Sequence, residues 1–120
     1  MKILIADDSR VMRQIVTRTL RQAGYNGHDL VEACDGAELV ETANSEKPDL
    51  VLSDWNMPKL TGVEALRALR AGGNQVPFGF VTSEGTPEMR DAATAAGAIF
   101  LITKPFTAET FKEQLEPILG

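Results

Sequence analysis

Short apolar runs alternate with segments of helical period along this chain, and the alternation repeats five times. Most of the runs lack a regular exchange of apolar and polar positions, which is typical of parallel strands that helices cover on both faces. Strands that alternate with helices in this way are typical of the α/β class. We therefore predict strands over residues 3–6, 30–33, 50–52, 78–81 and 98–102.

Periodic apolar positions define the first and last helices. Apolar residues between positions 11 and 23 recur at steps of three and four, and Gly24 stands where that helix should end. The last helix is predicted to begin near Thr107. Pro117 has no amide donor and its ring crowds the preceding turn, so we predict that regular helix ends by about Glu116.

Capping residues mark the starts of the other three helices. A side-chain oxygen at the N-cap accepts a hydrogen bond from a backbone amide of the first turn, which has no partner inside the helix. Two positions also have the spacing of a capping box, in which a glutamate three residues later returns the bond. The predicted pairs are Asp35 with Glu38 and Thr61 with Glu64, and the fourth helix should begin at Thr86 before Pro87.

Length, composition and charge limit the kind of protein this can be. A chain of 120 residues with 43% hydrophobic and 24% charged residues is typical of one globular domain, which we place over residues 1–120. The net charge of -5 repels nucleic acid, and the first apolar run is too short for a signal peptide or a membrane span. We expect a cytoplasmic monomer without nucleic-acid or membrane partners.

One thiol is present in the sequence, at Cys34. A single cysteine can form neither an internal disulfide nor a cysteine-rich metal site. We therefore predict that Cys34 is a small packing residue.

Polar residues stand at the carboxyl ends of four predicted strands. In an open parallel sheet the reactive crevice lies beyond these ends, so such residues can converge on one pocket. Strand ends also carry polar residues because they meet solvent, but several of these side chains together suit one kind of chemistry. The residues are Asp7, Asp8, Asp54, Thr82 and Lys104.

These five side chains suit transfer of a phosphoryl group. Three clustered carboxylates repel one another, and a cation relieves that repulsion; Mg²⁺ prefers oxygen ligands and is often shared with phosphate. Asp54 could act as a carboxylate nucleophile that forms an acyl phosphate. A hydroxyl at Thr82 and an ammonium at Lys104 could contact the phosphoryl oxygens.

Four stretches of the chain together resemble the response-regulator receiver family, and within it the single-domain chemotaxis regulators. The resemblance covers essentially the whole chain, and the combination is far more specific than any one stretch. The stretches are Ala6-Asp7-Asp8-Ser9, Ser53-Asp54-Trp55-Asn56-Met57-Pro58, Val81-Thr82-Ser83-Glu84 and Lys104-Pro105-Phe106.

This resemblance implies a fold and a mode of action. The fold is a doubly wound, flavodoxin-like parallel sheet of five strands in the order 2-1-3-4-5. Asp54 would accept phosphate from the phosphohistidine of a histidine kinase or phosphotransfer protein. Asp8 and Asp54 would ligate Mg²⁺ directly, Asp7 through water, and Asn56 through its backbone carbonyl. The target protein is not indicated, and with no predicted element after the fifth helix we expect the domain's own surface to bind it.

The resemblance also has consequences outside the metal ligands. Asn56 and Glu84 would flank the path of the water that hydrolyses the acyl phosphate, so they would tune a short phosphoryl lifetime. The Lys104–Pro105 bond should be cis and aim Lys104 into the pocket. Leu101 stands where the family has an aromatic switch residue, and Phe100 should face the opposite side of the sheet. We therefore expect the loop after Thr82 to respond to phosphorylation more than the surface around Leu101.

Three other readings of the same residues remain open. A phosphatase-like or dehalogenase-like enzyme also uses Asp, Thr or Ser, Lys and Mg²⁺, but here the acidic pair precedes the proposed nucleophile. A receiver that binds partners without phosphorylation would not need an intact carboxylate cluster. A dinucleotide-binding domain would need a glycine-rich first turn, where this chain has Asp7-Asp8-Ser9.

Overall fold

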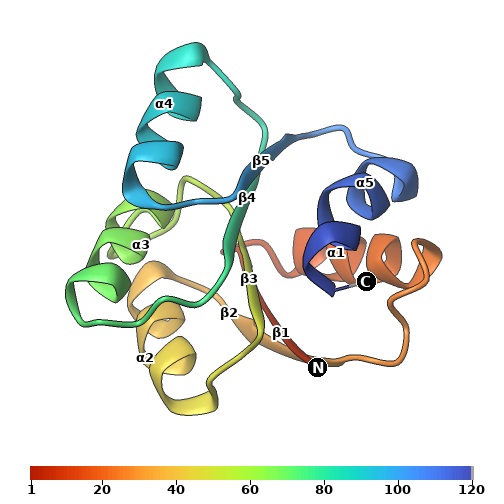
Figure 1. Cartoon of the computed structure of the whole chain (residues 1–120), viewed down its shortest axis with the longest axis horizontal. Coiled ribbons are helices and arrows are strands. Elements are labelled where there is room, and N and C mark those ends of the chain that lie inside the picture. The colour runs from red at the N-terminus through yellow and green to blue at the C-terminus, as the bar shows by residue number, and fades with distance from the viewer. Residues whose placement is uncertain (120) are drawn as a thin grey trace.

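Five parallel strands form one sheet with helices on both faces in the computed structural model, which describes residues 1–119 (Figure 1). The strand order is β2-β1-β3-β4-β5, and it confirms the predicted topology. The elements along the chain are β1 (Lys2–Ala6), α1 (Arg10–Gln22), β2 (Asp29–Ala33), α2 (Gly36–Glu46), β3 (Leu50–Ser53), α3 (Gly62–Ala71), β4 (Phe78–Thr82), α4 (Pro87–Ala96), β5 (Phe100–Thr103) and α5 (Ala108–Leu119).

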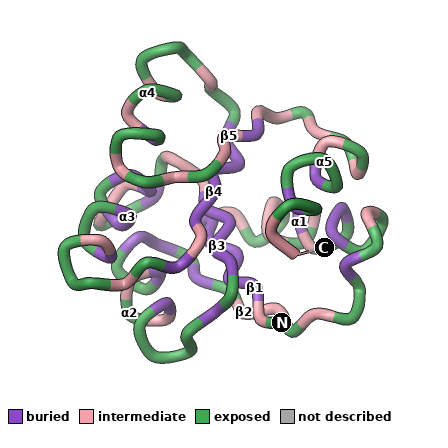
Figure 2. The backbone as a smooth tube through the Cα atoms, in the orientation of Figure 1, coloured by how far each residue is buried: buried purple, intermediate pink, exposed green. Residues whose placement is uncertain are grey.

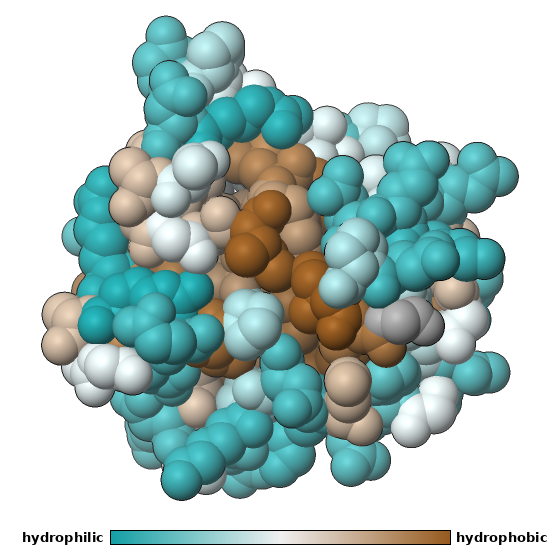
Figure 3. Space-filling view, viewed as in Figure 1, coloured by the Kyte–Doolittle hydropathy of each residue, from teal (hydrophilic) through white to brown (hydrophobic). Residues whose placement is uncertain are grey.

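The sheet divides the apolar core into two clusters. Successive strand residues point to opposite faces, so Leu4 joins the cluster under α2, α3 and α4, whereas Ile3 and Ile5 join the cluster under α1 and α5. Figure 2 shows the central strands buried between these two helical layers. In Figure 3 apolar residues gather between the layers on the visible face, and hydrophilic residues cover the helices. Among residues 1–119, no helix combines the length and apolarity needed to cross a membrane.

The position of β2 at the edge of the sheet explains why its apolar run is weak in the sequence. It pairs only with β1 in the described sheet, and its burial increases from exposed Asp29 to buried Ala33. The central strands β3 and β4 are buried along their whole length. Gly79 in β4 has a steric reason, because a Cβ there would lie 2.2 Å from ring atoms of Phe100 on β5.

Two predicted boundaries were wrong by two residues or more, and the other strand ends differ from the prediction by at most one residue. The fifth strand begins at Phe100, because Ala98 still donates its amide to the carbonyl of Ala93 and so completes the end of α4. The last helix continues through Pro117 to Leu119. Proline removes only one helical bond there, to the exposed Glu113, and packing of Leu119 against the α1–α5 cluster holds the final turn.

The helix caps agree with the predicted starts, with one difference. Thr61 and Glu64 form the complete capping box, and Thr86 accepts from the amide of Met89 at 3.2 Å. Asp35 accepts from the amide of Glu38 at 2.7 Å. The carboxylate of Glu38 faces the thiol of Cys34 at 3.5 Å, so the predicted return bond gives way to a side-chain contact.

Candidate functional site

The ends of β1, β3, β4 and β5 bring the predicted polar residues to one edge of the sheet. Ala6 pairs with Ser53, so Asp7 and Asp54 follow side by side, and the amide of Asp54 donates to the carbonyl of Ala6 at 2.9 Å. Carboxylate oxygens of Asp7, Asp8 and Asp54 lie within 4.8 Å of one another. These three residues form the acidic cluster discussed below.

Lys104 reaches the acidic cluster from the end of β5. Its Nζ lies 3.4 Å from Asp7 Oδ2 and 3.8 Å from Asp54 Oδ2. The ammonium is therefore shared between two carboxylates and makes a tight ion pair with neither. The bond between Lys104 and Pro105 is cis, as predicted.

Asp7 is the most enclosed carboxylate of the cluster, with 4% of its surface exposed. Burial raises the pKa of Asp7, and the nearby charge of Asp54 raises it further. The amide of Ser9, which donates to Asp7 Oδ1 at 2.9 Å, and the charge of Lys104 act in the opposite direction. The cluster thus holds more negative charge than Lys104 alone neutralises.

The donor set fits Mg²⁺. It consists of carboxylate oxygens from one buried, one half-buried and one exposed residue, so a bound ion could keep water ligands on its open side. Asp54 Oδ1 accepts from the amide of Trp55 at 2.7 Å, while Oδ2 faces Lys104. The carboxylate of Asp54 is thereby oriented by two contacts on different oxygens.

Thr82 is completely buried at the end of β4. Its Oγ1 accepts from the amide of Glu84 at 3.5 Å, and its carbonyl accepts from the amide of Lys104 at 2.8 Å. The backbone therefore links the predicted hydroxyl donor to the predicted cation.

Three other predicted residues lie outside the acidic cluster. Asn56 and Glu84 are exposed in the loops after β3 and β4, where the sequence places them two residues beyond Asp54 and Thr82. Leu101 lies within β5 and packs against the cluster under α2–α4, whereas Phe100 packs against the opposite cluster. The predicted opposite orientation of positions 100 and 101 is therefore confirmed, while the functional roles of all three residues stay predictions.

Sequence reasoning missed residues that support the site. Arg13 donates from Nη1 to the carbonyl of Asp7 at 2.6 Å and from Nε to Glu32 at 2.9 Å. A Cβ at Gly62 would lie 2.2 Å from the carbonyl oxygen of Asp54, so glycine allows α3 to begin against this backbone. A glycine directly after the predicted N-cap of α3 was a usable signal, whereas no spacing pointed to Arg13.

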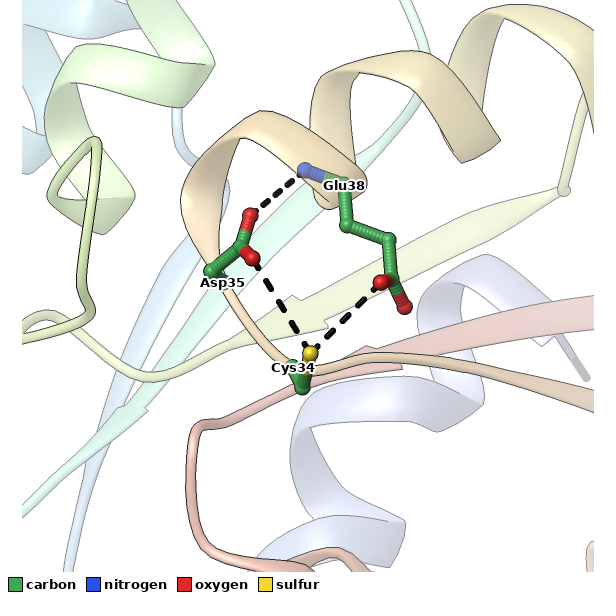
Figure 4. A group of neighbouring side chains, drawn as sticks. All are labelled: Cys34, Asp35 and Glu38. Atoms are coloured by element: carbon green, nitrogen blue, oxygen red, sulfur yellow. Dashed lines mark hydrogen bonds between the residues drawn. The ribbon is translucent and has the colours of Figure 1, made fainter.

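A second group of possible metal ligands lies at the start of α2 (Figure 4). Cys34 is exposed, so the prediction that it is a small packing residue was wrong. Its Sγ lies 3.5 Å from Glu38 Oε2 and 3.9 Å from Asp35 Oδ2. The contact to Glu38 and partial desolvation raise the pKa of the Cys34 thiol, and the adjacent carboxylates add to that effect.

Comparisons with known proteins place this geometry in context. Residues 3–116 match the family described as the response regulator receiver domain. Chemotaxis protein CheY1 of Helicobacter pylori is 38% identical over 100% of this chain and 98% of its own length. Chemotaxis protein CheY of Pseudomonas aeruginosa is 39% identical over 98% of this chain and 95% of its own length. A structure of Vibrio cholerae chemotaxis protein CheY4 superposes with a TM-score of 0.85, at 37% identity and 98% coverage of both chains.

Proposed function

The chain belongs to the response regulator receiver domain family, and on that premise we propose that it is a Mg²⁺-dependent switch that is phosphorylated on Asp54. The observation that carries this proposal is the contact of Lys104 with both Asp7 and Asp54 inside the acidic cluster. Transfer of a phosphoryl group requires a nucleophile, a positive charge near the phosphoryl oxygens and a set of oxygens that binds a metal ion, all in one place. The acidic cluster and Lys104 together offer all three.

The proposed reaction transfers a phosphoryl group from a phosphohistidine. An oxygen of Asp54 attacks phosphorus, the bond from phosphorus to the imidazole nitrogen breaks, and an acyl phosphate forms. Lys104 and the hydroxyl of Thr82 would contact phosphoryl oxygens. Asp8, Asp54 and the carbonyl of Asn56 would hold Mg²⁺, with Asp7 acting through water, and the ion would neutralise charge on the transferred group.

The switch proposal includes partners and a pathway. We propose a histidine kinase or phosphotransfer protein as donor and a protein target that binds the domain's own surface. The names of the relatives support chemotaxis, and a phosphorelay is the other pathway that the same chemistry serves. We further propose one domain over residues 1–120 that works as a cytoplasmic monomer without binding nucleic acid. Hydrolysis of its own acyl phosphate would reset the switch, so it would not turn over a diffusible substrate.

Phosphorylation with acetyl phosphate and Mg²⁺ tests the proposal, with intact mass as the readout. We expect the wild type to gain one phosphoryl group at most, only with Mg²⁺ present, and Asp54→Asn to gain none. Glu38→Gln is the control, because it removes a carboxylate from the second group of ligands and should be phosphorylated like the wild type. A gain of one phosphoryl mass in Asp54→Asn would contradict the assignment of Asp54 as the phosphorylated residue. Release of many equivalents of phosphate from a small ester would instead indicate a phosphatase-like enzyme.

A further inference from the structure

The guanidinium of Arg90 connects two backbone segments that flank the predicted phosphate-binding residues. Arg90 lies in the first turn of α4, and its Nε donates to the carbonyl of Gly85 at 3.3 Å. Its Nη1 donates to the carbonyl of Leu101 at 3.3 Å. One planar group thus bridges the β4–α4 loop, residues 83–86, and β5.

The loop is also packed closely against β5 at this point. A Cβ on Gly85 would lie 2.4 Å from Thr103 Cγ2 and 3.4 Å from Leu101 Cδ2. A larger residue at position 85 would therefore require either the Thr103 side chain or the loop to shift. Close packing and the two guanidinium bonds together hold the loop against β5.

A short path of hydrogen bonds leads from Thr82 to position 101. Thr82 Oγ1 accepts from the amide of Glu84, the next residue is Gly85, and Arg90 joins its carbonyl to that of Leu101. If the side chain of Thr82 moves toward a phosphoryl oxygen, its Oγ1 moves relative to the amide of Glu84, and the 3.5 Å contact changes. The loop would then shift at Gly85, whose carbonyl accepts a hydrogen bond from Arg90.

We propose that Arg90 is a positioning residue that couples the state of Thr82 to the backbone of β5 at Leu101. The coupling rests on the proposed phosphorylation of Asp54 and deepens it, because it assigns a route for the response. Leucine at position 101 has no ring whose rotation could report the change. The guanidinium provides a path through backbone carbonyls, which does not depend on the side chain at 101.

Amide exchange followed residue by residue by NMR tests the coupling, with beryllofluoride and Mg²⁺ as the phosphoryl mimic. In the wild type we expect exchange to change in residues 83–86 and, to a smaller extent, in residues 100–103. In Arg90→Met, which keeps most of the side-chain length without the donors, the change in 83–86 should persist and the change in 100–103 should be lost. Arg90→Lys can reach one carbonyl but not both, so it should restore little of the response in 100–103. Arg67→Met on α3 is the control and should respond like the wild type.

The apo protein gives a second readout that does not depend on the phosphoryl site. Loss of two weak hydrogen bonds should speed exchange of the Gly85 and Thr86 amides in Arg90→Met by roughly threefold. A response of residues 100–103 in Arg90→Met equal to that of the wild type would overturn the coupling. So would a wild type in which only residues 83–86 respond. If beryllofluoride changes no residue in the wild type, the proposed phosphorylation site itself is wrong, which is a different result from loss of coupling alone.

Discussion

Two groups of possible ligands in this molecule differ in how their atoms are already used. Asp7, Asp8 and Asp54 come from two strand ends, and Cys34, Asp35 and Glu38 come from one short stretch at the start of α2. Both groups bring their ligand atoms within 4.8 Å of one another. Proximity alone therefore does not distinguish them.

Burial and hydrogen bonding do distinguish them. Asp7 has its pKa raised by burial and by Asp54, so its group gains from a cation. Asp35 has its pKa lowered, chiefly because it accepts the amide of Glu38 as the N-cap of α2, and Lys59 lies 3.6 Å from its other oxygen. A carboxylate that is already satisfied has less to gain from a metal. A candidate metal site therefore differs from a helix cap less in the distances between its ligand atoms than in whether its carboxylates already have hydrogen-bond or cationic partners.

The largest difference between the two groups should appear on addition of Mg²⁺. Trp55 follows Asp54 and packs against Phe80 with ring centroids 4.9 Å apart, so its fluorescence should report binding. We expect a saturable change in the wild type, complete loss in Asp8→Ala, and an unchanged titration in Glu38→Gln. An undiminished response in Asp8→Ala would contradict the assignment of the metal site.

The phosphoryl lifetime should depend on residues beside the first group only. A bulky or basic side chain at Asn56 or Glu84 should hinder water on its way to the acyl phosphate, so Asn56→Arg and Glu84→Lys should lengthen the half-life by about tenfold, a barrier change of roughly 1.4 kcal/mol. Dephosphorylation after removal of acetyl phosphate, followed by intact mass, measures it. Glu38→Lys makes the same change of charge as Glu84→Lys, but beside the second group, and should leave the half-life unchanged. A wild-type half-life of many hours would argue against the predicted roles of Asn56 and Glu84.

The pH dependence of stability should have opposite sign at the two groups. Because the folded state raises the pKa of Asp7 above its ordinary 3.8, the folded state binds the proton more tightly, and stability falls as pH rises through that raised value. Asp7→Asn should therefore stabilise the Mg²⁺-free protein at neutral pH by about 1 kcal/mol, roughly 4 °C in Tm. Thermal unfolding with and without Mg²⁺ measures this gain.

Asp35 provides the opposite case. Its pKa is lowered in the folded state, so its stabilising effect is present above pH 3.8 and is lost as pH falls through the lower folded value. Asp35→Ala should destabilise the protein at neutral pH, and the difference from the wild type should shrink in acid. Unfolding curves for Asp7→Asn and Asp35→Ala, recorded from acid to neutral pH, test whether the two pH dependences have opposite sign. If both variants change stability in the same direction at neutral pH, the charges of Asp7 and Asp35 do not control the pH dependence of stability.

The smallest expected effect concerns the thiol of the second group. Cys34 is exposed, but Glu38 and Asp35 raise its pKa, so less thiolate should be available at neutral pH than in an unstructured peptide. Glu38→Gln should increase the rate of alkylation by iodoacetamide by about twofold to threefold. A rate that does not change, or that falls, would mean that Glu38 does not control the thiol.

Local sequence patterns were sufficient for much of the fold because the interactions behind them are local. A cap joins residues three positions apart, as at Thr61 with Glu64 and at Thr86 with Met89, so its spacing is visible in the sequence. Apolar runs located β1, β3 and β4 because both faces of these strands are buried. The order of the strands came from resemblance to a family, since periodicity carries no information on which strands are neighbours.

The identity of the candidate site residues was also accessible from sequence. Parallel strands present their carboxyl ends at one edge, so residues that follow those strands must gather there. This rule pointed to Asp7, Asp8, Asp54, Thr82 and Lys104 before any distance was known. The distances between them and the raised pKa of Asp7 depend on packing around the edge, which the spacing of residues in the sequence does not express.

Only the tertiary structure decided the contacts between residues that are distant in sequence or free to choose among partners. Arg13 reaches the carbonyl of Asp7, and Arg90 reaches Leu101 across 11 positions, because α1 and α4 dock on the sheet at particular angles. Packing of Leu119 carries α5 past Pro117, where the local rule alone predicts an end. Long side chains have several conformations, and helices several possible end points, that are nearly equal in local free energy. Packing in the folded molecule selects among them.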